Sequence, residues 1–380
     1  MGGAGPLDRR VGPGLIAVAT LVVNAGSSTL KLSLVDQHEH VVHAELIDHW
    51  DGVELRGLSD FVRGSGEVSA VGHRVVHGGP RFRSSVSIDD DVLDYLDSLV
   101  DLAPLHNPRA VAAARGVHEL LPNTPAVAVF DTAFHATMPA AAATYALPRE
   151  WNRTYGLRRY GFHGISHAYA ARRAADLLGR PLESLRIVTC HLGAGASLCA
   201  VRGGVSVDTT MGFTPLAGLV MQTRSGSVDP GLLLWLLERD DLDVAEVTRV
   251  LEHESGLRGL TGTSGDLREV LQARERGEPD ASLAFDVFIH RLGREIGGMA
   301  VSAGGLDALV FTGGMGEHSP EVRRAAAEHL EFLGVALAPE RDAGDGDRDV
   351  SASGAPVRTL VVAAAEDVQV ARDVAEVLGR

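Results

Sequence analysis

Short apolar runs rich in Val, Ile and Leu alternate along the chain with longer segments of helical periodicity. The runs read LIAVATLVV, AVAVFDTA, LRIVTCHL, ALVFTGG and RTLVVAAAE, and turn residues bound them as they bound buried strands. Asp229-Pro230 and Ser319-Pro320 each place a capping residue before a Pro at the first helical position. Another helix is predicted over residues 166–179, from a Ser to a C-cap Gly. This alternation predicts an α/β protein.

One hairpin pattern occurs twice, once in each half of the chain. TLVVNAGSSTLKLSLV, near the start, is echoed by IVTCHLGAGASLCAV, and each reads as a strand, a tight turn and a second strand. Aligning Gly26 with Gly193 sets Asn24 opposite His191. A chain of 380 residues also exceeds what one hydrophobic core usually serves. The echo therefore predicts a duplicated domain with one ligand held between the two halves.

Both turns have the composition of an anion site. Glycine can adopt positive φ and lets backbone N–H groups approach a ligand, which we expect at Gly26, Gly193 and Gly195. Further donors at the two hairpins are Ser27, Ser28, Thr29, Lys31 and Ser197. Plain hairpin turns remain the alternative for either copy alone. Neither copy is a Walker A loop or a complete G-x-G-x-x-G.

The overall composition excludes several classes of function. A formal charge of −15 argues against nucleic-acid binding, which selects clustered Lys and Arg. The two cysteines, Cys190 and Cys199, fit neither a disulfide framework nor a zinc site, so we expect a reducing cytoplasm. No run approaches 18 uncharged apolar residues, so no membrane span is predicted. The opening MGGAGPLDRRVGPG is interpreted as a disordered leader or a misassigned start.

Two arginines stand in weakly charged surroundings. Arg74 lies in VGHRVVHGG, and Arg224 lies in the long loop MGFTPLAGLVMQTRSGSVDPG. A guanidinium binds carboxylate or phosphate in a bidentate manner, so both are candidate anion clamps. For Arg74 a surface ion pair is the alternative. For Arg224 the anion clamp is favoured, because an isolated charge in so apolar a loop is unfavourable.

Two carboxylates and one histidine complete the candidate chemistry. Asp131 ends a strand-like run, where a metal-linked carboxylate or a general base would be placed, and a helix N-cap is the alternative. Glu366 follows the last strand-like run as a possible metal-linked carboxylate, with Asp367 as the helix N-cap. His163 and His167 are four residues apart, but Gly164 places His163 in a loop, which disfavours zinc. His163 is better placed to donate to a ligand anion.

Taken in order, these motifs resemble the acetate and butyrate kinase family of the sugar-kinase, Hsp70 and actin superfamily. The matching segments, which run from about residue 20 to the C-terminus, are NAGSSTLK, VGHRVVHGG, LAPLHNP, FDTAFHATMP, YGFHGISH, HLGAGAS, MGFTPLAGLVMQTRSGSVDPG and FTGGMGEHS. The resemblance implies duplicated ribonuclease-H-like domains with a central cleft and phosphoryl transfer between ATP and a carboxylate. The implied division is a leader at 1–16, one domain at 17–133 with 368–380, and a nucleotide-binding domain at 134–367.

The resemblance also implies ligands and partners. ATP or ADP and a short-chain carboxylate or acyl phosphate are the expected substrates, with Mg²⁺ or Mn²⁺ as the metal. A cytoplasmic homodimer is expected. Phosphoryl transfer suits these residues because it depends on placement and charge neutralisation more than on a strong base.

Roles follow from the resemblance for individual positions. The implied catalytic residues are Arg74, Asp131, His163 and Arg224. The implied metal ligands are Asn24 and Glu366. The implied substrate pocket comprises Arg74, Val76, Leu105, Phe162 and Pro215. The implied nucleotide-binding residues are Lys31, His191, Gly193, Gly195, Asp266, Leu267, Arg268, Gly313, Gly314, Met315 and Gly316.

Four positions depart from the family pattern. Ala194 stands where H-L-G-N-G has Asn, and Gln222 replaces a Gly two residues before Arg224. Leu267 replaces a Phe, and Ala365 replaces a polar neighbour of Glu366. Losing one charge-assisted hydrogen bond to a phosphate costs roughly 1.5–3 kcal/mol, which slows a kinase about 10- to 100-fold. The alternatives are therefore a weakly active enzyme or a non-catalytic regulatory homologue, and separately a kinase that prefers propionate or butyrate, because a methylene in an apolar pocket is worth only about 1–3 kcal/mol.

Overall fold

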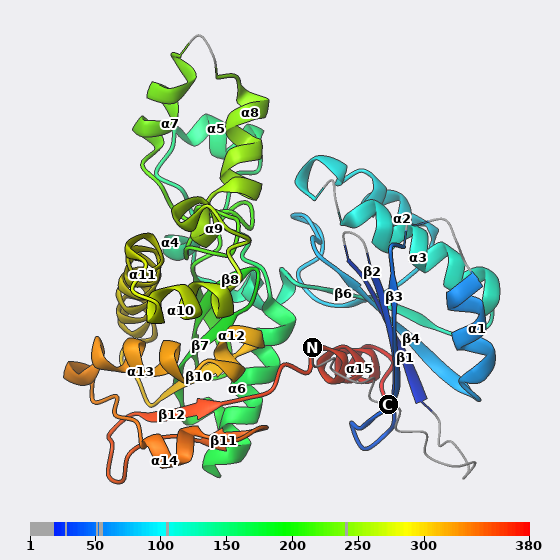
Figure 1. The fold of residues 1–380 in the computed structure, drawn as a ribbon. Coiled ribbons are helices and arrows are strands. Elements are labelled where there is room, and N and C mark those ends of the chain that lie inside the picture. The colour runs from blue at the N-terminus through cyan, green and yellow to red at the C-terminus, as the bar shows by residue number, and fades with distance from the viewer. Residues whose placement is uncertain (1–18, 27–28, 51, 53–55, 104–105, 240–241) are drawn as a thin grey trace. The chain divides into compact units, whose positions relative to one another are not determined.

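The computed structural model describes residues 19–380 except 27–28, 51, 53–55, 104–105 and 240–241. The expected leader at 1–16 lies outside these residues. The chain forms two compact units, which Figure 1 colours from blue to red along the sequence. Unit 1 extends to Ala133 and includes Ala365–Arg380, and unit 2 is Phe134–Ala364.

Unit 1 is built on a six-stranded sheet of order β3-β2-β1-β4-β6-β5. The strands are β1 (Ala19–Ala25), β2 (Thr29–Val35), β3 (Val41–Asp48), β4 (Val68–Val75), β5 (Val86–Ser87) and β6 (Ala126–Phe130). The pairs β1–β4 and β4–β6 are parallel, whereas β1–β2, β2–β3 and β5–β6 are antiparallel. The carboxyl ends of β1, β4 and β6 therefore meet at one edge of the sheet.

Helices cover both faces of this sheet. They are α1 (Arg56–Gly64), α2 (Asp90–Asp97), the 3₁₀ turn η1 (Val100–Leu102), α3 (Asn107–Leu120) and α15 (Glu366–Val377). The apolar side chains of β1 and β2 pack with Leu58 and Phe61 of α1 and Val117 of α3. On β4, a Cβ at Gly72 would lie 2.5 Å from Cγ1 of Val370 in α15. Glycine at this position therefore lets the C-terminal helix pack closely against the strand that carries Arg74.

Unit 2 contains the second six-stranded sheet, of order β11-β12-β10-β7-β8-β9. Its strands are β7 (Arg186–Leu192), β8 (Ala196–Arg202), β9 (Val205–Thr209), β10 (Ala308–Thr312), β11 (Arg348–Asp349) and β12 (Arg358–Val361). Helix α6 (Gly164–Leu178) packs through its alanines on β7, β8, β10 and β12. The long helix α11 (Pro279–Ala303) also packs on β7, β8 and β9.

The remaining elements of unit 2 are short. Before the sheet come η2 (Ala133–Thr137), α4 (Ala140–Ala143), α5 (Arg149–Thr154) and η3 (Leu182–Ser184). After β9 come α7 (Pro230–Leu237), α8 (Val244–Arg249), the π-helix η4 (Val250–Glu254), α9 (Gly256–Thr261) and α10 (Leu267–Glu275). Flanking the last strands are α12 (Gly313–His318), α13 (Pro320–Glu328), η5 (Glu331–Leu333) and α14 (Pro339–Asp342).

The two sheets have the same topology. Read from its other end, the second sheet is β9-β8-β7-β10-β12-β11, and each position has the strand direction of its counterpart in the first sheet. The echoed hairpins are β1–β2 and β7–β8. The α/β class and the duplication predicted from the hairpin echo are confirmed.

Several predicted boundaries need correction. Helix α6 begins at Gly164 rather than Ser166, because His163 adopts a left-handed conformation (φ 57°) and caps it. Asp367 is not an N-cap, since α15 begins at Glu366 after Ala365. Residues 365–367, which the sequence assigned to the second domain, belong to unit 1 with this helix. The caps Asp229 and Ser319 and the C-cap Gly179 are confirmed. Among the described helices, none is long and apolar enough to cross a bilayer.

Candidate active site

A polar cluster in unit 1 centres on Arg74, and we call Asn24, Arg74, Asp131 and Glu366 the Arg74 cluster. Arg74 near the end of β4 donates from Nε and Nη2 to both oxygens of Asp131, at 3.2 and 2.6 Å. Its Nη1 donates to Oδ1 of Asn24 at 3.0 Å, and Glu366 lies 3.8 Å from its Nε. The parallel register brings the ends of β1, β4 and β6 together, and α15 adds Glu366 as its first residue.

Two carboxylates share one guanidinium in this cluster. Burial raises the pKa of Asp131 to about 6 although Arg74 opposes the rise, and the charge of Glu366 adds to it. Burial alone would lower the pKa of Arg74, but Asp131 and Glu366 outweigh it and raise the pKa. Both oxygens of the Asp131 carboxylate accept from Arg74, and among the described residues no backbone N–H donates to this carboxylate as an N-cap would require. Arg74 is in a partly buried ion pair and not in the exposed pair that the alternative expected.

The donor set of the Arg74 cluster suits a divalent cation. Asn24 and Glu366 offer amide and carboxylate oxygens, which Mg²⁺ and Mn²⁺ prefer, and the excess of carboxylate over guanidinium leaves a negative charge. Within the described ranges, no group of three or more His, Cys, Asp or Glu side chains could hold a metal by itself. A cation held by Asn24 and Glu366 would therefore take its other oxygens from water and phosphate.

Three further residues predicted to bind the nucleotide or the substrate belong to the sequence of unit 1. Lys31, assigned to the nucleotide, has its ammonium 2.8 Å from Asp367 and belongs to the unit of the Arg74 cluster. Val76 follows β4 directly and is half-buried. Leu105, which like Val76 was predicted to line the substrate pocket, lies outside the described residues.

A second cluster, in unit 2, surrounds the turn of the echoed hairpin. We call His163, Arg224 and Gly195 the His163 cluster. A Cβ at Gly195 would lie 3.4 Å from Nη1 of Arg224 and 3.5 Å from Nε2 of His163, so both side chains lie against the backbone of this turn. His191 stacks on His163 with ring centroids 4.3 Å apart, and its Nδ1 hydrogen-bonds with Ser166.

Hydrogen bonds fix the orientation of the His163 ring. Ser197 Oγ lies 2.9 Å from Nδ1 of His163 and 2.8 Å from Nε2 of His167. Burial keeps the pKa of His167 well below its ordinary value, so His167 is a neutral hydrogen-bonding group. Its Nδ1 hydrogen-bonds with Thr189 at 2.7 Å. His167 is structural, as the sequence suggested, and through Ser197 it orients His163.

Arg224 carries a charge that the described chain does not pair. Its Nη1 donates to the carbonyl of Pro215 at 3.3 Å and contacts Sδ of Met221 at 3.7 Å. Burial lowers its pKa, with Glu252 opposing the shift from beyond ion-pair distance. Among the described residues no carboxylate forms a salt bridge with Arg224, which fits the predicted anion clamp.

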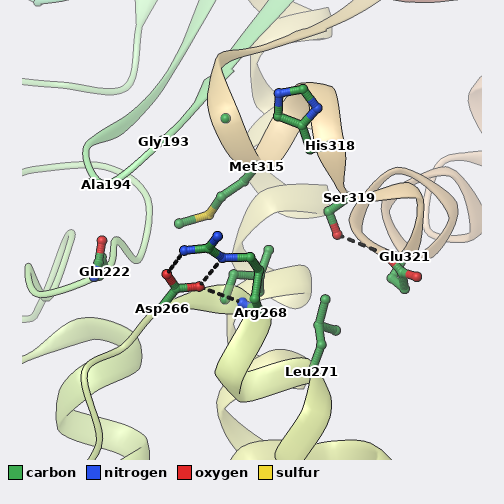
Figure 2. Close-up of a pocket in the computed structure, with 12 residues that line it drawn as sticks. Gly193, Ala194, Gln222, Asp266, Arg268, Leu271, Met315, His318, Ser319 and Glu321 are labelled. Atoms are coloured by element: carbon green, nitrogen blue, oxygen red, sulfur yellow. Dashed lines mark hydrogen bonds and ion pairs between the residues drawn. The ribbon is translucent and has the colours of Figure 1, made fainter. Parts of the chain in front are cut away.

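A cavity of about 580 Å³ lies wholly within unit 2 (Figure 2). Its lining includes six of the predicted nucleotide residues: Gly193, Asp266, Leu267, Arg268, Gly314 and Met315. Asp266 caps α10 and holds the Arg268 guanidinium at 2.6 and 3.0 Å, which lowers the pKa of Asp266. The structure thus gathers six of the eleven predicted nucleotide residues around one space large enough for a small molecule.

The other predicted nucleotide residues do not line this cavity. Gly313 has φ 78°, and a Cβ there would lie 2.9 Å from the carbonyl oxygen of Leu192. Gly316 packs against Phe311 and Cys190. These glycines let α12 pack against the ends of β7 and β10. His191 and Gly195 belong with the His163 cluster.

The prediction of positive φ in the hairpin turns is wrong, since Gly26, Gly193 and Gly195 all lie outside that region. Close approach explains Gly26 alone. A Cβ at Gly26 would be 2.9 Å from Oγ1 of Thr29, whereas a Cβ at Gly195 would make only ordinary van der Waals contacts with Arg224 and His163. The predicted pocket residues of unit 2 are Phe162, which is buried, and Pro215, whose carbonyl binds Arg224.

Sequence reasoning missed part of the cavity wall. Leu271, His318, Ser319 and Glu321 also line it. Leu271 is one helical turn after Leu267, a spacing that could have identified it. Ala194 and Gln222, noted only as departures, line the cavity as well.

Comparison with known proteins gives a consistent result. Residues 55–372 match the model of the acetokinase family. The acetate kinase of Bacillus cytotoxicus is 50% identical over 386 residues, covering 93% of this chain and 97% of that protein. The acetate kinase of Synechococcus sp. is 53% identical over 317 residues, covering 83% of this chain and 78% of that protein.

Solved structures agree with these sequence matches. Porphyromonas gingivalis acetate kinase superposes with a TM-score of 0.89 at 34% identity, covering 95% of this chain and 100% of that chain. A propionate kinase from Francisella tularensis gives a TM-score of 0.86 at 34% identity, with coverages of 94% and 99%.

Proposed function

The chain belongs to the acetokinase family, and on that premise we propose that it is an acetate kinase, which transfers a phosphoryl group reversibly between ATP and acetate. The observation that carries the proposal is the 50% identity to a curated acetate kinase over 93% of this chain. The Arg74 cluster and the His163 cluster support it, because each places one arginine where it can donate to an anion.

The chemistry requires no strong base. An acetate oxygen attacks the γ-phosphorus of ATP, forming the new O–P bond as the bond to the bridging oxygen of ADP breaks, and ADP leaves with that electron pair. Acetate is already ionised at pH 7, so no proton is removed. Three of the five N–H groups of Arg74 bind Asp131 and Asn24, which leaves two for the carboxylate of acetate. Arg224 and His163 stabilise the charge on the transferring phosphoryl oxygens.

Magnesium, or manganese, is the metal that we propose for this reaction. Asn24 and Glu366 would hold it, with Asp131 nearby as a further carboxylate. A bound divalent cation supplies neutralisation of the negative charge on the phosphates. Glu366 is about one-fifth exposed, which leaves it open to a ligand from solvent.

The reaction is tested by trapping the acyl phosphate as its hydroxamate. Purified protein receives Mg·ATP and equal concentrations of acetate, propionate and butyrate. We expect acetate to react fastest, although an extra methylene in an apolar pocket is worth only about 1–3 kcal/mol. Faster turnover of propionate would favour the activity named for the Francisella tularensis neighbour. ADP binding without any acyl phosphate would contradict the kinase and favour a regulatory homologue.

A homodimer is the assembly that we propose, and α7 supports it. This helix reads PGLLLWLL and has no buried residue, and Leu234 and Trp235 are 66% and 53% exposed. Adjacent exposed apolar side chains of this size mark an interaction surface. Two free, buried cysteines, Cys190 and Cys199, support the proposed cytoplasmic location.

If α7 forms the dimer interface, a charged substitution on this helix should halve the molecular mass in solution. Leu234→Asp places a charge on the apolar helix and should convert the dimer to a monomer, measured by light scattering after size exclusion. Leu283→Asp is the matched control, because Leu283 is a similarly exposed Leu (56%) on another helix. A monomeric wild type, or a Leu234→Asp protein that remains dimeric, would contradict the proposal.

A further inference from the structure

Two departures from the family pattern touch each other in the structure. The backbone N–H of Gln222 donates to the carbonyl of Ala194 at 3.2 Å, and both residues line the cavity of unit 2. Figure 2 shows them on the same side of that cavity, opposite Met315 and Arg268. The Gln222 side chain therefore lies on the same wall of the cavity as Ala194, whose methyl group replaces the carboxamide of the family pattern.

The position of Gln222 is fixed by its backbone. Its carbonyl accepts from the N–H of Arg258 at 2.9 Å, and a Cβ at Gly265 would lie 2.5 Å from the same oxygen. Two neighbouring segments therefore hold this part of the loop. Arg224 of the His163 cluster follows two residues later in the same loop.

The carboxamide of Gln222 has hydrogen-bonding capacity to spare. Its Nε2 donates to the carbonyl of Ser264 at 3.3 Å, which anchors the side chain beside Asp266. A primary amide has two N–H donors and a carbonyl with two lone pairs, so this bond uses one donor of the set. Asp266 and Arg268 already neutralise each other. The amide can therefore act as an uncharged donor in this part of the wall.

We propose that the Gln222 side chain supplies to a bound nucleoside polyphosphate the amide hydrogen bond that Ala194 cannot make. A carboxamide at 194 would extend from the hairpin turn between Gly193 and Gly195, where Ala194 lines the same cavity as Gln222. Gln222 brings the same functional group to the same region from the adjacent loop. This inference rests on the proposed function for the identity of the ligand. It makes Gln222 a nucleotide-binding residue of this chain.

A cycle of four proteins tests the exchange: wild type, Gln222→Gly, Ala194→Asn and the double variant. The Kd for Mg·ADP is measured by titration calorimetry, and thermal unfolding confirms that each protein is folded. We expect Gln222→Gly to weaken ADP binding about 10- to 100-fold, as one charge-assisted hydrogen bond would. Ala194→Asn alone should change Kd less than about threefold, and the double variant should return to within about threefold of wild type.

Two control variants separate the effect of the amide group from the effect of side-chain volume and from that of removing any glutamine. Gln222→Leu keeps most of the side-chain volume and should weaken binding as Gln222→Gly does. Gln37→Gly changes an exposed Gln in a turn of unit 1 and should leave Kd unchanged. Wild-type affinity in Gln222→Gly, or a double variant no better than Gln222→Gly, would overturn the inference.

The readout also distinguishes this inference from the proposed function. If wild type forms no acyl phosphate but Gln222→Gly still weakens ADP binding, the kinase proposal fails and the exchange stands. If wild type turns over and Gln222→Gly binds ADP normally, the exchange fails and the kinase stands. A wild type that binds no ADP would overturn both.

Discussion

Two arginines with one predicted task have opposite electrostatic surroundings. Arg74 neutralises Asp131 and lies close to Glu366, whereas Arg224 forms no salt bridge with any described residue. Removing one partner of a buried pair leaves the other charge uncompensated, but replacing an isolated buried charge relieves a desolvation penalty. The sequence shows both residues only as arginines in weakly charged segments. The difference depends on partners that are distant along the chain.

We therefore expect opposite stability effects from the same substitution. Arg74→Leu should lower the free energy of unfolding by about 3–5 kcal/mol, because it strands Asp131. Arg224→Leu should leave it unchanged or raise it by up to about 1 kcal/mol, because no ion pair is lost. Both should reduce kcat/KM for acetyl phosphate formation by about 100-fold or more. Urea unfolding of each ligand-free protein gives the comparison.

A fall of several kcal/mol in Arg224→Leu would show that this guanidinium has a structural partner. The Arg74 part of the prediction has its own control in the double variant Arg74→Leu with Asp131→Leu. This protein removes both charges and should recover part of the lost stability.

At the scale of elements, the start of α12 separates structural from ligand-facing glycines. Gly313 has positive φ and almost touches the backbone of Leu192, whereas a Cβ at Gly314 would meet nothing within 4 Å. Gly314 also lines the cavity and Gly313 does not. The sequence Gly-Gly-Met-Gly predicts close approach of some partner to this segment. It cannot say which glycine serves packing and which serves a ligand.

Alanine at each position should distinguish the two. Gly313→Ala combines about 1–2 kcal/mol for a left-handed backbone with about 1–3 kcal/mol for the clash, so we expect a loss of roughly 2–5 kcal/mol. Gly314→Ala should keep or raise stability by up to about 1 kcal/mol, as Ala does in a helix. Its methyl group enters the cavity, so KM for ATP should rise about 10-fold. Thermal unfolding and steady-state kinetics measure these effects, and equal stability losses would contradict them.

Element boundaries were predictable where one local interaction decides them. Asp229 and Ser319 cap their helices as the sequence indicates, because a side-chain oxygen next to a first-turn Pro is a local signal. The start of α6 was missed because a non-glycine residue, His163, adopts a left-handed conformation. Asp367 was misassigned because it pairs with Lys31 of β2 and does not cap α15. Both errors come from tertiary context.

At the scale of the whole molecule, the duplication was readable because a strand–turn–strand pattern is local and occurs twice. The equivalence of all six strands in each sheet goes beyond that signal, since β5 and β11 are only two residues long. The Arg74 cluster joins residues from β1, β4 and α15 with Asp131 after β6. Sequence patterns suggest such residues one at a time. Their grouping follows from the parallel register.

Both units also bury neutral histidines, which makes the stability of the molecule sensitive to acid. Burial lowers the pKa to about 4 for His73 and His77 in unit 1 and for His135 in unit 2, and it also holds the pKa of His167 well below its ordinary value. The unfolded chain titrates near 6.5, so below that pH it binds more protons than the folded state. Stability should therefore fall as pH drops from about 6.5 to about 4, by up to about 1.4 kcal/mol per pH unit for each histidine.

Substitution of His73 tests this pH dependence of stability without breaking a hydrogen bond. It is buried in β4, and neither ring nitrogen has a hydrogen-bond partner among the described residues. With a folded pKa of about 4, the histidine should lower stability at pH 5 by about 2 kcal/mol and at pH 8 by almost nothing. His73→Leu should thus gain about 2 kcal/mol more at pH 5 than at pH 8 in urea unfolding. His118→Gln, at an exposed position of α3, should show no such difference. An equal effect of His73→Leu at both pH values would contradict this prediction, because it would mean that burial does not lower the pKa of His73 in the folded protein.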